Sequence, residues 1–243
     1  TGLSNWGYSY DTLDQLIEVQ QDSLTVESYR YDAFGRRSLI STVEGAGLTI
    51  DVGILNDGSD RAIDVTQGAL GQAVALRRYT YSANVDEPLQ LETFTAAGAF
   101  DARYTYHADH LGSIRYLTDS SGTIVNAYDY DSYGRPMFGI TAFDQPFAYT
   151  GREWDAATGL YHYRARAYDP VSGRFLQEDP IWFAAGDLNV QVFYAQHLCG
   201  LAERYGPVQR HGHGRFSGQA NNRCQRHWAI IQVEPLAAQL HNF

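Results

Sequence analysis

Lysine is absent from the 243 residues of this chain, so all 18 basic side chains are arginines. A gene that avoids lysine codons is the simplest explanation, and selection for bidentate arginine–carboxylate pairs is the alternative. The two cysteines, Cys199 and Cys224, are too few to define a disulfide framework for a chain of this size. No apolar stretch approaches the roughly 18 residues of a membrane helix, which argues against a helical membrane protein.

A start signal is also lacking. The sequence begins Thr1-Gly2-Leu3, with no initiator methionine and no signal-peptide pattern. We therefore expect a piece of a longer polypeptide whose export signal lies upstream.

Tyrosine, glycine and acidic residues are abundant. The chain has 18 Tyr and 23 Gly and is 14% aromatic, a composition that argues against disorder and favours β structure. Charge changes sign near residue 190. Residues 1–190 hold 26 acidic groups against 13 Arg, or −13, whereas residues 191–243 hold 2 against 5, or +3. We expect residues 191–243 to form an irregular or disordered tail.

A degenerate repeat runs through the first part of the chain. Its full form, Tyr-x-Tyr-Asp-x-x-Gly-Arg, occurs at residues 29–36 and 128–135, and partial copies begin at residues 8, 79 and 104. The second tyrosines stand at 10, 31, 81, 106 and 130, which gives a period of about two dozen residues with one copy missing. A period of this length is typical of repeat proteins.

Each copy has the chemistry of a strand followed by a turn. Tyr-x-Tyr places two rings on one strand face, because side chains alternate, and Asp-x-x-Gly supplies a turn in which glycine takes a positive φ. Residues 114–119 and 123–128 flank such a turn and predict a hairpin. Residues 41–75 alternate less clearly and are expected to be strand and loop. Because lone hairpins are marginal, we predict an all-β fold of stacked antiparallel β-hairpins.

Two further stretches carry a family resemblance. Residues 110–119 read His-Leu-Gly-Ser-Ile-Arg-Tyr-Leu-Thr-Asp, and residues 148–187 form a long signature rich in Tyr, Arg, Gly and Asp. With the repeats, they resemble the RHS (rearrangement hot-spot, or YD-repeat) proteins over residues 1–190. The resemblance implies part of a spiralling β-shell at 1–140, an RHS-associated core at 141–190 and a divergent tail at 191–243. The motif residues that it identifies are Tyr31, Asp32, Gly35, Tyr130, Asp131, Gly134, His110, Gly112, Tyr168, Asp169, Gly173 and Arg174.

The resemblance also implies a function. RHS proteins build a hollow β-cocoon that the core closes and that holds a variable C-terminal toxin. The chain is thus expected to be a shell and core segment of a secreted or cell-surface bacterial toxin used in competition between bacteria. Its expected partners are the rest of its own shell, a C-terminal effector and a cognate immunity or secretion-system protein. No cofactor or metal is implied.

The core of many RHS proteins is similar to an aspartic protease that cleaves its own chain, with two carboxylates sharing a proton. Asp179 matches the first catalytic aspartate, and Arg166 matches the arginine that orients the pair. The second aspartate is missing, since no Asp follows Asp187, and Glu203 is a weak stand-in because its side chain is longer. We expect a degenerate protease in which Asp179 and Arg166 form a structural ion pair. An active self-cleaving protease is the alternative.

The tail at 191–243 arose either by an old frameshift, which we favour, or by natural divergence. Its 53 residues have few apolar runs and would make a poor toxin core. Its arginines lack an aromatic platform, which argues against nucleic-acid binding as its role, and its metal-ligand spacing fits no standard zinc finger. Those potential ligands are Cys199, His211, His213, Cys224 and His227.

Two features of the repeats have competing interpretations. His107, Asp109 and His110 form a potential metal site, but a turn whose side chains bind the backbone is the expected arrangement. The tyrosine stripes would suit a surface module that binds carbohydrate, but dense aromatic ladders more often build sheet faces through cross-strand ring pairs.

The intact mass of the freshly purified chain tests self-cleavage. We expect one species of full mass, both for the parent and for Asp179→Asn, because the second catalytic aspartate is missing. Two fragments from the parent and none from Asp179→Asn would contradict this and would identify Asp179 as catalytic. Glu203 would then be the next carboxylate to replace.

Overall fold

A computed structural model describes residues 5–68, 71–84 and 86–180, and its regular structure is almost entirely β-strand. The chain divides into two compact units, Thr1–Glu178 and Asp179–Phe243. Of the second unit, the described residues are Asp179 and Pro180. The three-part division of the sequence stays a prediction, and both sheets described below belong to the first unit.

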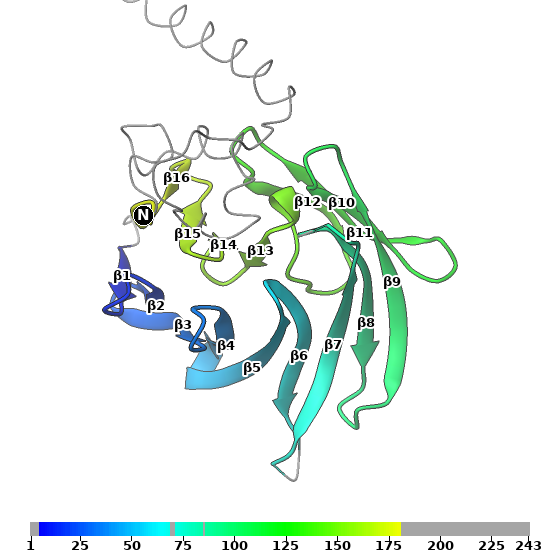
Figure 1. The fold of residues 1–243 in the computed structure, drawn as a ribbon, viewed down its shortest axis with the longest axis horizontal. Coiled ribbons are helices and arrows are strands. Elements are labelled where there is room, and N and C mark those ends of the chain that lie inside the picture. Colours follow the sequence, from blue (N-terminus) through cyan, green and yellow to red (C-terminus); the bar gives the residue numbers. More distant parts are fainter. Residues whose placement is uncertain (1–4, 69–70, 85, 181–243) are drawn as a thin grey trace, which may run out of the picture. The chain divides into compact units, whose positions relative to one another are not determined.

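The first unit contains two antiparallel sheets, which confirms the predicted fold of stacked hairpins. The larger one, called the shell sheet here, has twelve strands in sequence order (Figure 1). They are β1 (Trp6–Tyr10), β2 (Leu16–Gln21), β3 (Leu24–Tyr31), β4 (Arg37–Glu44), β5 (Leu48–Asp57), β6 (Asp60–Gln67), β7 (Ala73–Tyr81), β8 (Pro88–Phe94), β9 (Phe100–Ala108), β10 (Ile114–Thr118), β11 (Ile124–Tyr130) and β12 (Pro136–Thr141).

The smaller one, called the core sheet here, has four strands: β13 (Glu153–Asp155), β14 (Leu160–Tyr163), β15 (Arg166–Asp169) and β16 (Arg174–Phe175). Two short 3₁₀ turns complete the regular structure, η1 (Gly45–Gly47) and η2 (Tyr149–Gly151). No helix among the described residues is long and apolar enough to cross a membrane.

The aspartate of the repeat holds each turn together. Asp32 Oδ1 accepts the backbone N–H groups of Phe34 at 2.9 Å and Arg36 at 3.0 Å, while Gly35 takes a φ of 75°. Neither of those N–H groups has a partner in the strand ladder, so the carboxylate satisfies both. Four more aspartates accept the same two N–H groups, at positions two and four residues further on: Asp11, Asp109, Asp119 and Asp131.

The two tyrosines of the repeat have different partners. The first ring is buried in the sheet face, as at Tyr29, which is 5% exposed. The second tyrosine donates its hydroxyl to a backbone carbonyl at the start of the preceding strand: Tyr31 to Leu16 at 2.7 Å, and Tyr130 to Ile114 at 2.7 Å. Tyr81 makes the same bond to the Arg61 carbonyl, 2.8 Å away. These three second tyrosines therefore each tie a strand to the one before it.

Where the sequence lacks a copy of the repeat, the structure still has the corresponding hairpin. The hairpin of β5 and β6 occupies its place, in the stretch where strand and loop were expected. Ile54, which is 4% exposed, takes the place of the first tyrosine. Asn56 takes the place of the second, and its side-chain Nδ2 donates to the Arg37 carbonyl at 3.0 Å. Side chains of other types thus make the contacts of the tyrosines here.

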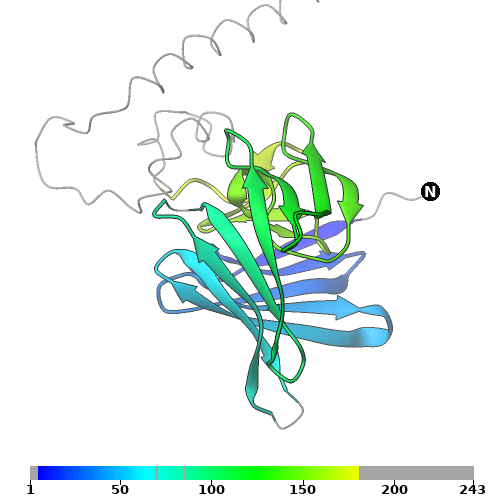
Figure 2. The same ribbon diagram turned by 90° about the vertical axis from the view of Figure 1, so that its right-hand side faces the viewer.

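Successive turns of an antiparallel sheet lie at opposite ends of its strands. One end of the strands, called the turn edge here, therefore carries the turns β1–β2, β3–β4, β5–β6, β7–β8, β9–β10 and β11–β12. Figures 1 and 2 show the twelve strands following a curve, with β13–β16 on its inner side. Two apolar clusters fill that side: Leu160 and Ala167 of the core sheet join the side chains of β2–β5, and Phe147 joins those of β7–β11.

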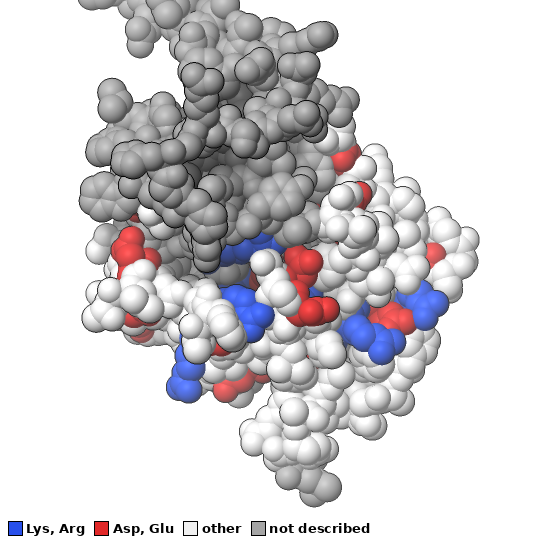
Figure 3. All heavy atoms as spheres, in the orientation of Figure 1, with Lys and Arg blue, Asp and Glu red and all other residues white. Residues whose placement is uncertain are grey.

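On the outer face, charges pair across neighbouring strands. Glu92 on β8 receives Arg78 from β7 and Arg103 from β9, and on the face in Figure 3 acidic and basic groups lie beside one another. Both arginine side chains are 55% exposed, so water screens these pairs and they contribute little to stability. The outer face of β7, β8 and β9 therefore carries paired charges.

Replacing Asp131 by alanine tests the turn chemistry. Asp131→Ala removes the acceptor for the N–H groups of Tyr133 and Arg135, so we expect unfolding free energy to fall by about 1 kcal/mol. Asp129→Ala is the matched control two residues away, because Asp129 makes only an exposed pair with Arg115 and should cost less than about 0.5 kcal/mol. Denaturant unfolding of the three proteins measures this. Equal losses in the two variants would show that the turn aspartate has no special role.

Candidate functional site: the junction of the core and shell sheets

The core sheet and the segment before it lie along the turn edge and contact one turn after another. The Thr150 N–H donates to Ser113 Oγ at 3.0 Å, in the β9–β10 turn. At the next turn along this edge, Tyr161 donates its hydroxyl to the Gly134 carbonyl at 2.7 Å, and Tyr168 donates to the Tyr133 carbonyl at 2.8 Å. The contacts run along the row of turns, so the core sheet covers this edge of the shell sheet.

Glycines let the two sheets approach closely. A Cβ atom at Gly134, where φ is 84°, would lie 2.3 Å from the ring of Tyr149. A Cβ atom at Gly151 would lie 2.4 Å from the carbonyl oxygen of Asp86. A Cβ atom does not approach non-bonded atoms this closely, so both positions require glycine, for its positive φ and because a side chain has no space.

Buried ion pairs join the sheets at β4, β6 and β13. Arg37 binds Asp155 at 2.5 Å and Glu153 at 2.7 Å. Arg61 binds the same Glu153 at 2.7 Å, and Asp64 on its own strand at 2.6 Å. Both arginine side chains are at most 4% exposed. The carboxylates of β13 therefore neutralise two cations that are buried between the docked sheets.

The electrostatics of this junction fix the protonation of its groups. Burial alone would raise the pKa of Glu153, but Arg37 and Arg61 outweigh it and hold this pKa well below its usual value. Burial, with the nearby charge of Arg37, lowers the pKa of His162 to about 3. The glutamate is therefore ionised and the imidazole neutral across the physiological pH range.

A second group of charges joins the core sheet to the β7–β8 loop. Asp86 receives Arg152 at 3.2 Å and Arg164 at 2.6 Å, and Arg164 also reaches Asp60 at 3.4 Å. Asp86 and Arg164 both have positive φ, at 62° and 58°. Backbone of this kind is costly for residues other than glycine and persists where surrounding contacts fix it. This turn contains no Asp-x-x-Gly sequence and anchors the core sheet through the Asp86 side chain.

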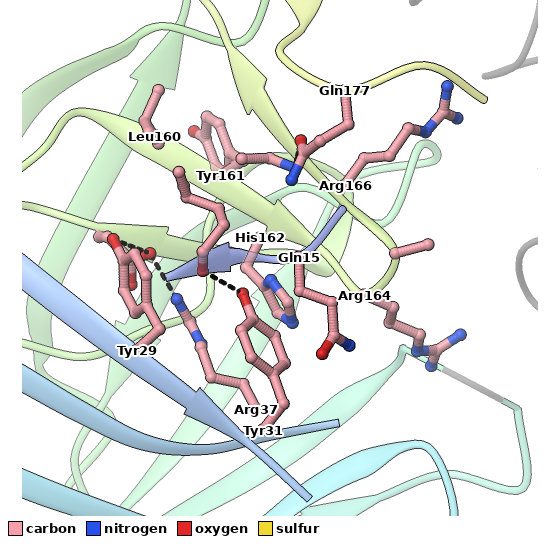
Figure 4. Close-up of a pocket in the computed structure, with 14 residues that line it drawn as sticks. Gln15, Tyr29, Tyr31, Arg37, Leu160, Tyr161, His162, Arg164, Arg166 and Gln177 are labelled. Atoms are coloured by element: carbon pink, nitrogen blue, oxygen red, sulfur yellow. Dashed lines mark hydrogen bonds and ion pairs between the residues drawn. The ribbon is translucent and has the colours of Figure 1, made fainter. Parts of the chain in front are cut away.

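The cavities at the junction are small. One of about 10 Å³ lies among Tyr29, Tyr31, Arg37, His162 and Arg166, which converge from both sheets (Figure 4). Another of about 20 Å³ lies beside Arg61, Asp86 and Glu153. Each has room for about one water molecule. Neither can admit a sugar or a peptide, so within the described residues the junction is a packed interface.

The predicted catalytic residues fall in different parts of the chain. Arg166, on β15, is 1% exposed, and its guanidinium carbon lies 3.7 Å from the centre of the Phe175 ring. Asp179 is also buried and is the first residue of the second compact unit. Glu203 lies outside the described residues, as do the cysteines and histidines of the tail. The roles proposed for these residues stay predictions.

The structural motif residues lie in the turns and in the core sheet. Tyr31, Tyr130, Asp32, Asp131, Gly35 and Gly134 belong to the β3–β4 and β11–β12 repeats, and His110 and Gly112 belong to the β9–β10 turn. Tyr168, Asp169, Gly173 and Arg174 form the β15–β16 hairpin, where Asp169 and Arg174 face each other. Beside His110, Asp109 accepts two backbone N–H groups of its own turn. In the described part of the chain, no group of three potential ligands is placed to hold a metal ion.

Sequence reasoning missed the pairing of Arg37 and Arg61 with β13. A signal was available, because Arg37 is the first residue of β4 and Arg61 the second of β6, close to the strand starts that Leu16 and Ile114 occupy in other repeats. All four side chains are buried. A cation where the repeat otherwise has an apolar side chain needs a buried carboxylate, and Glu153 and Asp155 of the core signature supply it.

Comparison with known proteins gives a family match. The family model described as Teneurin YD-shell matches residues 96–194. That range covers the last strands of the shell sheet and the whole core sheet. The matched part therefore includes Glu153 and Asp155 of the junction but not Arg37 and Arg61.

Two curated relatives illustrate the range of proteins that contain such a segment. The tRNA3(Ser)-specific nuclease WapA of Bacillus spizizenii is 30% identical over 200 residues, which cover 80% of this chain and 8% of the relative. Salivary gland surface protein 1 of Aedes aegypti is 41% identical over 105 residues, which cover 42% of this chain and 3% of the relative. The chain thus spans less than a tenth of either relative.

A solved structure shows the same fold. The crystal structure of TcdB2-TccC3-TEV matches with a TM-score of 0.64 and 22% identity. The match covers 79% of this chain and 10% of that one. At this level of identity, the likeness concerns the arrangement of strands.

Alanine at Gly134 tests the close packing of the two sheets. Gly134→Ala places a methyl group against Tyr149, so we expect a loss of unfolding free energy of about 3 kcal/mol or more, from strain at positive φ and from overpacking. Gly122→Ala is the control, because Gly122 has nearly the same φ of 83° and no atom within 4 Å of the methyl group that alanine would add; about 1 kcal/mol is expected. Thermal unfolding of both variants gives the comparison. Similar losses would mean that backbone strain alone accounts for Gly134.

Proposed function

The chain belongs to the RHS (YD-repeat) family of shell proteins, and we propose that its first unit is the closing segment of a shell that encapsulates a C-terminal effector. The observation that carries the proposal is the core sheet, which covers the turn edge and is joined to it by buried ion pairs. A turn edge that is covered by a second sheet is the arrangement expected where a β-shell closes.

The charges make this closure specific. If the core sheet docked out of register, Arg37 and Arg61 would be buried without Glu153 and Asp155, and the cost of leaving a buried charge unpaired is typically about 3–5 kcal/mol. Undocking must also expose the apolar cluster that includes Leu160 and Ala167. The core sheet therefore holds one position on the shell sheet, which a closing element requires.

The nature of the effector is suggested by a relative. The Bacillus spizizenii relative is named as a nuclease, and the chain matches 8% of its length. The nuclease activity of that relative can therefore reside in another part of its chain, which is compatible with a shell segment that has a structural role. The proposed partners are the rest of the shell and an effector C-terminal to the core, and the proposed location is outside the cell or at its surface.

The enzymatic and carbohydrate-binding alternatives have less support. The cavity beside Arg166 has room for about one water molecule rather than a peptide. The first tyrosines of the described repeats, such as Tyr29, Tyr79 and Tyr128, are each 5% exposed, so their rings pack into the sheet face rather than forming an exposed ladder for sugars. A structural core is the function that this geometry supports best.

Trypsin tests enclosure, because the segment after residue 190 contains Arg204, Arg210, Arg215, Arg223 and Arg226. If the shell segment encloses this C-terminal stretch, these sites should be cut at least tenfold more slowly in the folded chain than in the chain unfolded by denaturant. Mass spectrometry of the first fragments gives the order of cleavage. Tail sites that are cut equally fast in both states would refute the proposal for this chain.

Arg37→Met and Arg36→Met form the matched pair for this experiment. Arg37→Met breaks the buried pairs to β13 and should expose the tail sites together with sites in the core sheet. Arg36→Met removes a partly exposed pair with Asp32 and a bond to the Gly58 carbonyl, but no contact with the core sheet, and should leave the cleavage pattern unchanged. The same pattern from both variants would mean that core docking does not control access.

A further inference from the structure

Between the sheets, one tyrosine hydroxyl lies between two buried carboxyl groups. The Tyr29 hydroxyl is 2.8 Å from Glu27 Oε2 on its own strand and 3.3 Å from Asp155 Oδ2 on β13. Glu27, Tyr29 and Asp155 are 4%, 5% and 8% exposed. Water therefore has little access to this contact, and the three groups must satisfy one another.

Proton counting limits how they do so. A tyrosine hydroxyl has one proton to donate, and an ionised carboxylate can only accept. If both carboxyl groups were ionised, only one of the two contacts would be a hydrogen bond, and the other would set an oxygen against a buried anion. Both contacts become hydrogen bonds when one carboxyl group carries a proton and donates it to the Tyr29 oxygen.

The charge balance gives the same answer. The connected buried cluster holds four acidic groups (Glu27, Asp64, Glu153 and Asp155) and three arginines (Arg37, Arg61 and Arg77). With every group ionised, the cluster has one uncompensated negative charge, and one bound proton makes it neutral. Uncompensated buried charge is unfavourable enough that such groups take up protons instead.

The neighbours identify which carboxyl group holds the proton. Burial raises the pKa of Asp155, but Asp155 receives Arg37 at 2.5 Å, and this direct contact with a cation favours its ionised form over that of Glu27. Glu27 receives no arginine directly: its other oxygen, Oε1, accepts the Thr42 hydroxyl of β4 at 2.7 Å. From β2, the residue opposite Glu27 is the apolar Val19.

The remaining charged groups that face this contact come from three other strands: Arg61 on β6, Glu153 on β13 and the neutral His162 on β14. The first two bind each other, so neither neutralises Glu27. The proton therefore resides on Glu27.

We propose that Glu27, Tyr29 and Asp155 form a proton-dependent latch between the shell sheet and the core sheet, closed when Glu27 is protonated and weakened when it ionises. Burial, reinforced by the negative charge of Asp155, raises the pKa of Glu27 to about 7, which supports this assignment. The inference does not depend on what the shell contains.

The direction of the pH effect follows from the proton balance. Between the usual glutamate pKa of 4.5 and about 7, the folded chain binds one more proton at Glu27 than the unfolded chain does. Stability from this group is therefore fully present below the lower value and is lost as pH rises through the upper one. The folding equilibrium should weaken on the order of 100-fold across this window.

Denaturant unfolding of the whole chain at pH 5 and pH 8 tests the latch. We expect Glu27→Gln, which keeps a neutral donor at the site, to remove most of the loss that the parent shows on going to pH 8. Glu44→Gln, at an exposed glutamate near the end of β4, should behave like the parent. A parent and a Glu27→Gln protein with the same dependence on pH would overturn the proposal.

Infrared spectroscopy tests the proton directly and does not require that Glu27→Gln folds well. The folded parent at pH 6 should show the carbonyl stretch of a buried protonated carboxyl group, and the band should disappear by pH 9. In Asp155→Asn, which removes the neighbouring negative charge, the disappearance should shift to lower pH. Absence of the band in the folded parent at pH 6 would refute the latch.

Discussion

The buried pairing of Arg37 and Arg61 with Glu153 and Asp155 is the interaction on which the rest of this structure depends. Two cations lie in the face of a sheet where the repeat otherwise places apolar side chains, and their partners come from a segment about a hundred residues away. A hydrophobic contact tolerates small displacements, but a buried ion pair does not. The apolar clusters make the association of the two sheets favourable, and the ion pairs select a single alignment.

The repeat explains how a long sheet provides a regular edge for that association. At four of the turns an aspartate satisfies two turn N–H groups, and Tyr31, Tyr81 and Tyr130 each fix the start of the strand before them, so similar turns recur along the edge. The core sheet uses this regularity in two ways. It donates to backbone carbonyls at the turn that contains Gly134, and it binds the Asp86 carboxylate at the β7–β8 turn.

Most of the fold could be predicted from the sequence, because its signals are local. Alternating tyrosines, turn glycines and the period of two dozen residues identify strands and hairpins without knowledge of distant contacts. The hairpin of β5 and β6 was less clear, since Ile54 and Asn56 make the contacts of the two tyrosines with different chemistry.

The junction was harder to predict, because its partners are far apart in the sequence. Neither Asp86 nor Glu153 stands in a local pattern that names its partner, and the proton shared near Tyr29 follows only from three-dimensional proximity. Arg166 and Asp179 were identified by resemblance, and their proposed chemistry stays a prediction.

The position of all the core-facing turns on one edge also imposes a rule of parity on such a chain. Inserting or deleting a single strand would move every later turn to the opposite edge, away from the core sheet. Inserting or deleting a whole hairpin keeps each turn on its edge and changes only the circumference of the curve. Over evolutionary time, such a sheet can therefore gain or lose strands in even numbers while the core sheet still docks on the same row of turns.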